Sequence, residues 1–165
     1  MFRTMRRRAQ QTDPSDCERI LRDATSGVLA LAGDDGYPYA VPMSFVYDGE
    51  RATVYFHSAR DGHKLDAIRN CAKASFCAIG RDRVASREFT TDYESVIAFG
   101  NARIVDDARE HAYAIGILAD KYAPDVAPSE RRREIEQAEG RYCMIALRIE
   151  HMTGKRARLA ADSRD

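Results

Sequence analysis

Short apolar segments separated by tight turns are the feature that most restricts the fold of this chain. Residues 28–32 and 52–57 are apolar runs that include valine, leucine, tyrosine and phenylalanine, and the aromatic and β-branched residues among them favour strands. The turns at 33–36 and 48–49 contain Asp-Gly pairs, which are typical of hairpin connections. Such close connections join antiparallel strands, because a parallel pair needs a long crossover. The sequence therefore predicts a mainly β, α+β fold of the barrel or sandwich class.

The strand predicted at 37–47 contains two prolines. Proline cannot donate a backbone hydrogen bond, so Pro38 and Pro42 indicate a sheet edge or a bulge, where backbone groups stay free to contact a ligand. The charged segment 80–87 is expected to be a surface loop. About six antiparallel strands are predicted, at 28–32, 37–47, 52–57, 74–79, 89–105 and 142–151, with peripheral helices at 14–26, 63–70, 107–122 and 129–138.

Composition favours a single domain whose net charge does not attract a charged partner. The 165 residues include 26 basic and 26 acidic side chains, so no net field favours nucleic acid or an anionic membrane. No apolar run is long enough to span a bilayer. We expect a flexible basic arm at 1–12, a single domain at 13–155 and a flexible tail at 156–165, with Met5 as an alternative start of the chain.

The spacing of cysteines and histidines matches no metal or redox motif. The four cysteines lie far apart, without a Cys-x-x-Cys pair, which fits reduced thiols in the cytoplasm. The four histidines have no compact zinc spacing. No P-loop or Rossmann glycine pattern occurs either. We therefore predict a cytoplasmic protein without a metal site.

The segment 55–68 is expected to join a strand, a polar turn and a helix. An Asp-Gly pair marks the turn, and apolar residues recur at helical spacing after it. Ser58, His63 and Lys64 lie beside the helix start, where unpaired amides and the helix dipole favour an anion. A hydroxyl and two basic side chains in that position suit a phosphate group. An exposed polar loop is the alternative explanation for the same residues.

Four motifs in this order resemble the pyridoxamine 5'-phosphate oxidase-like flavoproteins, and most of all their nitroimidazole-resistance branch. The motifs are GYPYAVP, YFHSA, GHKL and TDYESV, at 36–42, 55–59, 62–65 and 91–96. The resemblance extends over about residues 5–155. It implies an FMN-binding split β-barrel and a homodimer whose flavin sites lie at the subunit interface. A twofold partner would also cover apolar surface that a small barrel leaves exposed.

The resemblance also implies which residues contact FMN. They belong to three groups: ligands of the phosphate, residues along the ribityl chain and flavin ring, and a third group of two residues from the second subunit with an additional lysine near the C-terminus. In that order the groups are Ser58, His63 and Lys64; His57, Ala59, Pro42, Met43, Ser44 and Phe45; and Tyr93, Ser95 and Lys155.

Some of these residues have a plain structural alternative. His57 is the candidate catalytic residue, for proton transfer, but a histidine at a strand end is more often structural. Met43 and Phe45 would otherwise be core residues, and Lys155 a solvated lysine near the chain end.

As function, the resemblance implies an FMN-dependent oxidoreductase that acts on a small molecule, with a nitroaromatic compound as one candidate. Oxidation of pyridoxamine phosphate itself is disfavoured, because the arginine-rich C-terminal motif of the true oxidases is not identified. F420 or haem could replace FMN, as in other split-barrel branches. A flavin-binding sensor or carrier without turnover is the alternative outside enzymes. The electron donor and the substrate stay open.

Overall fold

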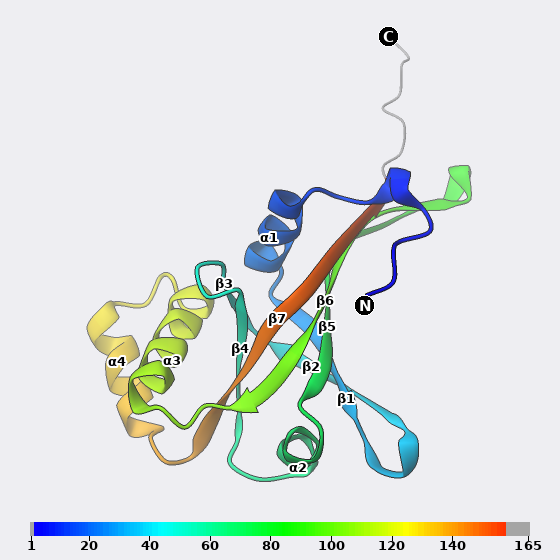
Figure 1. Ribbon diagram of the computed structural model, residues 1–165. Coiled ribbons are helices and arrows are strands. Elements are labelled where there is room, and N and C mark those ends of the chain that lie inside the picture. The colour runs from blue at the N-terminus through cyan, green and yellow to red at the C-terminus, as the bar shows by residue number, and fades with distance from the viewer. Residues whose placement is uncertain (1, 158–165) are drawn as a thin grey trace.

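A computed structural model describes residues 2–157, which form one antiparallel sheet with helices at its edges and on its outer side (Figure 1). The order of the seven described strands across the sheet is β2-β1-β5-β6-β7-β4-β3. Their bounds are β1 Ser26–Ala32, β2 Pro38–Ser44, β3 Val46–Asp48, β4 Thr53–Ala59, β5 Lys73–Ala85, β6 Thr90–Ile104 and β7 Tyr142–Ala157. The α-helices are α1 Pro14–Asp23, α2 His63–Asn70, α3 Ala108–Tyr122 and α4 Pro128–Gln137, and the 3-10 turns are η1 Arg8–Gln10, η2 Asp34–Gly36 and η3 Ser86–Glu88.

The main hydrophobic core lies on the inner face of the sheet. Three aromatic rings meet edge to face at its centre, because this arrangement matches the negative ring face with a positive ring edge. The ring centroid of Phe76 lies 4.6 Å from that of Phe45 and 5.2 Å from that of Phe56. Helix α1 closes one side of this core with a single apolar stripe at helical spacing: Cys17, Ile20 and Leu21.

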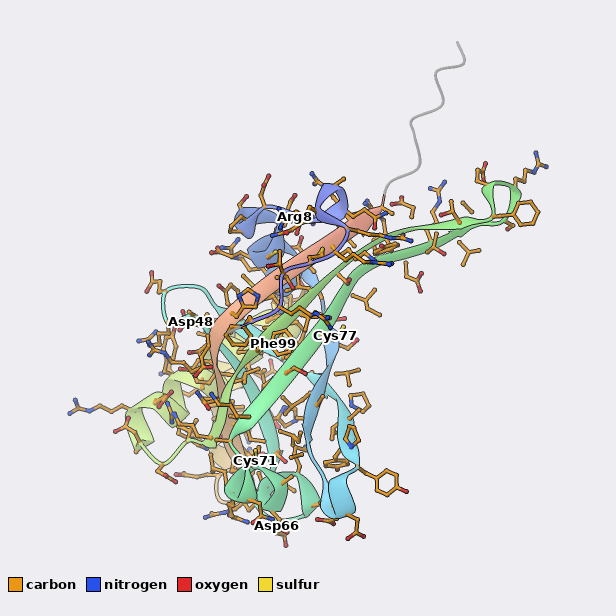
Figure 2. The ribbon with its side chains drawn as sticks, turned by 45° about the vertical axis from the view of Figure 1, so that its right-hand side comes forward. Arg8, Asp48, Asp66, Cys71, Cys77 and Phe99 are labelled. Carbon is orange, nitrogen blue, oxygen red and sulfur yellow. The ribbon has the colours of Figure 1, made fainter. Side chains whose placement is uncertain are left out.

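The outer face of the sheet is covered only in part. Helix α3 packs over β4 and the first half of β7, and a second core of residues such as Tyr55, Leu118 and Met144 lies between them. No helix of the described chain covers the outer face of β1, β5 and β6, and Figure 2 shows Cys77 and Phe99 on this open face. Val28, Cys77 and Ile97 form one row across these strands, and Val28 and Ile97 are about two-fifths exposed, at 38% and 41%.

The predicted strand at 37–47 is in fact two strands. The chain leaves the β1–β2 ladder at Phe45, whose amide donates to the Tyr122 hydroxyl at 2.8 Å, and the next residues pair with β4 as the short strand β3. This break raises the number of described strands from the predicted six to seven. The prediction for the prolines is confirmed, because Pro38 and Pro42 both lie in the edge strand β2.

The prediction of a surface loop at 80–87 is wrong. β5 continues through this segment to Ala85 and pairs with β6 as a two-stranded hairpin that projects from the body (Figure 1). Its charged residues are compatible with strands because both faces of such a hairpin are solvated. The β6–β7 register shifts between Phe99 and Gly100, and a Cβ at Gly100 would lie 1.8 Å from the Arg148 carbonyl oxygen, so only glycine fits this bulge.

The N-terminal segment and the end of β7 lie side by side. The Thr12 amide donates to the Gly154 carbonyl at 3.0 Å, and Gln11 forms a bridge with Lys155. β7 extends to Ala157, two residues beyond the predicted end of the domain, and the rest of the predicted tail lies outside the described residues. None of the described helices combines the length and the apolar character needed to cross a bilayer.

Candidate cofactor site

Three elements meet where the sheet is open between β2 and β4. β2 is an edge strand of the sheet. β3 pairs with β4 only along Thr53–Tyr55, so on that side the rest of β4 has no strand partner and faces the opening. α2 comes directly after β4, and its Lys64 reaches across the gap. The Lys64 Nζ donates to the Ser58 hydroxyl of β4 at 3.1 Å and lies 3.2 Å from the Met43 sulfur of β2. One amine therefore bridges two strands that are not paired with each other.

The Lys64 amine has neutral partners only. Burial lowers the pKa of Lys64, because the charged form loses solvation. Among residues 2–157 no carboxylate lies within ion-pair distance of this amine. Its neighbour Cys143 donates its thiol to the Ala59 carbonyl, and burial raises the pKa of that thiol, which keeps it uncharged near neutral pH. The site thus holds a desolvated cation without a counter-ion.

The start of α2 adds backbone donors to this cation. Gly62 occupies the N-cap with a φ of +112°, a conformation that side chains with a Cβ rarely adopt, and it offers no capping side chain. The amides of Leu65 and Asp66 turn back to the Gly62 carbonyl, whereas the His63 and Lys64 amides have no acceptor in the described chain. We call Ser58, Lys64 and these two amides the anion cradle, because all of them favour negative charge.

The His63 imidazole does not point into the cradle in this structure. Its Nε2 lies 3.3 Å from an Asp34 carboxylate oxygen, and its ring stacks on Tyr39 at 4.2 Å between centroids. The imidazole thereby connects α2 to the β1–β2 turn. A contact between His63 and a phosphate stays a prediction, and it would require the imidazole to leave Asp34.

His57 and Ser58 point to opposite faces of β4. Successive strand residues alternate between faces, so Ser58 is buried toward the cradle while His57 is exposed on the outer side. There His57 borders a hollow between the strand and helices α3 and α4, together with Tyr142 and Ile135. The structure therefore separates the predicted catalytic residue from the predicted phosphate ligands by the thickness of one strand.

The four candidates of residues 42–45 divide in the same way. Pro42 and Ser44 are exposed on the outer face, whereas Met43 and Phe45 are buried on the inner face. Phe45 is fully buried against Phe76, as the core alternative predicted. Met43 is buried as well, yet it also contacts the cradle through its sulfur.

The last three candidates form a separate group at the other end of the sheet. Ser95 and Lys155 are partners in the β6–β7 register, and the Lys155 amine lies 5.4 Å from the centre of the Tyr93 ring. Figure 2 shows this end beside Arg8, whereas Asp66 of α2 marks the opposite end. Within one chain these residues do not meet the anion cradle.

Sequence reasoning missed the partners that hold the cradle and His63 in place. Cys143 could have been found from the alternation of the last strand, which assigns it to the inner face with Ile145. Asp34 and Tyr39 carry no such signal, because their contact with His63 depends on the packing of α2 against the β1–β2 hairpin.

Comparison with known proteins then identifies the family. The family model described as pyridoxamine 5'-phosphate oxidase matches residues 13–156. The chain belongs to this family. No curated protein matches the chain in sequence.

Several solved structures share the fold of this pyridoxamine 5'-phosphate oxidase family member. One is a protein from Bacteroides thetaiotaomicron, provisionally described as a 5-nitroimidazole antibiotic resistance protein, with 22% identity, a TM-score of 0.71 and coverage of 87% of this chain and 83% of that one. A FAD and haem binding protein from Mycobacterium smegmatis has 22% identity and a TM-score of 0.74, over 94% and 77% of the two chains. A conserved hypothetical protein from Mycobacterium tuberculosis has 16% identity and a TM-score of 0.80, over 98% of each chain. These likenesses establish the split-barrel fold.

Proposed function

We propose that this protein is an FMN-binding oxidoreductase that acts on a small molecule. The observation that carries the proposal is the unpaired Lys64 amine, held between Ser58 and Met43 at the uncapped start of α2. A cation without a counter-ion is costly to bury, and a phosphate group would supply the missing negative charge. When bound, FMN supplies the electron-transfer chemistry, and the protein supplies position and electrostatics.

The size of the cradle favours one phosphate. It offers one amine, one hydroxyl and two backbone amides, which together suit a terminal monophosphate. FAD and haem are bound by the Mycobacterium smegmatis protein of the same fold, and F420 is a further alternative. The site therefore has to be tested with these cofactors beside FMN.

The visible absorption spectrum of the purified protein tests the cofactor directly. We expect a flavin spectrum that persists after FMN is added and the sample is dialysed. Parallel samples receive FAD, F420 or haemin. Retention of another cofactor in place of FMN would refute the assignment, and a chain that retains none would remove the basis for the proposed contacts.

We further propose that each site is completed by a second copy of the chain. The open face carries the apolar row of Val28 and Ile97, and the outward-facing Ser95 and Lys155 continue it. A twofold partner that covers this face would bring its own Lys155 end toward the cradle of the first copy. This arrangement accounts for the separation of the two groups of candidate residues within one chain.

A mixing experiment distinguishes a shared site from a site within one chain. Lys64→Glu and Lys155→Glu should each abolish FMN retention alone. If the sites are shared, mixed dimers of the two variants contain one intact site, so about a quarter of all sites should recover after subunit exchange. A site formed within one chain would show no recovery, and a monomeric mass by light scattering would contradict the dimer itself.

The proposed reaction is reduction or oxidation of a small molecule, with nitroaromatic compounds as the first candidates to assay. The resemblance and the Bacteroides thetaiotaomicron neighbour support this choice. NADH and NADPH are tested as electron donors, followed by a nitroaromatic acceptor. A bound flavin that is neither reduced nor reoxidised would support the sensor or carrier alternative. We place the protein in the cytoplasm, consistent with four free cysteines.

A further inference from the structure

Helix α4 packs loosely over the outer side of the molecule. None of its ten residues is buried, although it follows α3 by a short turn and lies beside it (Figure 1). Hollows of about 610 and 720 Å³ lie on its two sides, within the range of pockets that hold small ligands. The larger one reaches His57 and is called the α3–α4 groove below.

The α3–α4 groove has an apolar wall and an aromatic end. Its wall consists of alanine, valine and isoleucine side chains from both helices and the turn between them, among them Ala119, Val126 and Ile135. At its β-sheet end lie His57 and Tyr142. The Tyr142 ring already stacks on His111, at 5.2 Å between centroids, so a planar ring would use its other face, while the exposed imidazole of His57 offers a hydrogen bond to a polar substituent.

The charges that line the groove are unfavourable for an anion. Both cationic side chains are already occupied: Arg131 donates to the Ala123 and Val126 carbonyls at 2.8 and 2.6 Å and pairs with Asp120, and Arg141 donates to the Gln137 carbonyl at 2.7 Å. The other charged residues that line it are Glu130 and Glu134. The electrostatics therefore favour a neutral occupant.

The groove lies on the opposite side of β4 from the anion cradle. Ser58 belongs to the cradle and the preceding residue, His57, belongs to the groove. An occupant of the groove is thus separated from the cradle by a single strand. A site suited to an anion and a site suited to a neutral molecule therefore lie on the two sides of β4.

We propose that the α3–α4 groove binds a neutral, planar aromatic molecule, with His57 as its hydrogen-bonding partner. The proposal that such a molecule binds rests only on the residues that line the groove. The identification of the occupant as the substrate of the oxidoreductase rests on the proposed function.

Imidazole NMR signals provide a direct test. Of the four histidines in the chain, His57 lines the groove. His111 stacks on the groove residue Tyr142, so its signal is not used as a control. The full-length protein is titrated with 2-naphthamide, with and without FMN, and its histidine ¹H–¹³Cε1 signals are followed. The His57 signal, assigned from its loss in His57→Gln, should move in a saturable manner. The signals of His63 and His151 should not move.

Matched ligands and variants sharpen the test. 2-Naphthoate has nearly the same shape but a negative charge, and should bind about tenfold more weakly or worse. Ala119→Phe on α3 and Ala138→Trp at the C-cap of α4 fill the groove from two sides and should each weaken 2-naphthamide binding at least about tenfold. Ala127→Trp lies outside the groove and should leave binding unchanged, and far-UV circular dichroism verifies that each variant folds.

Three results would overturn the proposal: no movement of the His57 signal, movement of His63 or His151 instead, or equal binding to Ala138→Trp and Ala119→Phe. Because the readout is ligand binding, it does not depend on a flavin. A chain that binds 2-naphthamide but no FMN would refute the proposed function and leave the groove assignment standing.

Discussion

Two lysines, Lys64 and Lys121, are partly buried in this molecule, and the chemical character of their surroundings differs. Burial lowers the pKa of both amines, that of Lys121 to about 8. Lys121 donates to the Ala24 carbonyl at 2.6 Å and lies 4.2 Å above the centre of the Phe45 ring. Lys64 has a hydroxyl and a thioether as its partners.

The helix dipoles distinguish the two sites further. The amine of Lys121, a residue in the last turn of α3, lies at the C-terminal end of α1, where the partial charge is negative and the last carbonyls need donors. Lys64 lies in the first turn of α2, where the partial charge is positive and a cation is disfavoured. The first lysine therefore stabilises the fold, whereas the second has the placement expected of a residue kept for a ligand.

The largest expected effect is on cofactor binding by Lys64→Glu. The substitution places a carboxylate beside the proposed phosphate, so FMN affinity should fall by about 100-fold or more. Fluorescence titration of FMN measures it. Arg69→Glu makes the same charge change near the end of the same helix, where Arg69 pairs with Asp66, and should change the affinity by less than about threefold. Equal losses in both variants would disprove the cradle.

The next effect is on stability. Lys121→Met removes the donor for the Ala24 and Leu21 carbonyls at the end of α1, and should lower the free energy of unfolding by about 2 kcal/mol. Urea unfolding at pH 7 measures this loss. Lys73→Met is the control, because Lys73 is an exposed surface lysine that pairs with Glu150, and it should cost less than about 1 kcal/mol.

The pH dependence of stability sharpens the role of Lys121. Its folded pKa of about 8 lies below the ordinary lysine value of 10.5, so the unfolded chain binds more protons between these values. The free energy of unfolding should therefore rise with pH across this window, by about 1 kcal/mol per unit at the steepest point. Above pH 10, Tyr55 opposes the rise, because burial raises the pKa of its hydroxyl.

The variant Lys121→Met isolates the contribution of Lys121 to the pH dependence of stability. The difference in unfolding free energy between the native chain and Lys121→Met, measured in urea from pH 7 to 10, cancels the tyrosines common to both. It should widen with pH. A constant difference would mean that Lys121 has the same pKa in both states.

Much of the fold could be predicted from local sequence, because local chemistry determines it. The Asp-Gly turns were sufficient to predict the hairpins, and the prolines of β2 were sufficient to predict the sheet edge. The break at Phe45 could not be predicted, since it depends on Tyr122, which lies 77 residues away. The prediction of a loop at 80–87 was wrong because the charged residues were taken to exclude a strand, although a projecting hairpin accommodates charged side chains.

For the candidate site, the residue types could be predicted but their distribution in space could not. Alternation alone places His57 and Ser58 on opposite faces, yet the resemblance grouped them around one ligand. The distance of Lys155 from the cradle and the pairing of His63 with Asp34 depend on long-range packing. No local pattern carries that information.

The smallest effect is also the one that separates the two lysines most clearly, because its sign is opposite. Lys64→Met removes a desolvated cation from the start of α2 and places a thioether beside Met43. Without FMN this variant should be more stable than the native chain by about 0.5–1 kcal/mol. Excess FMN should raise the thermal midpoint of the native chain by mass action and leave that of Lys64→Met nearly unchanged. A destabilised Lys64→Met that still responds to FMN would make Lys64 a structural residue like Lys121, and the contrast between the two sites would disappear.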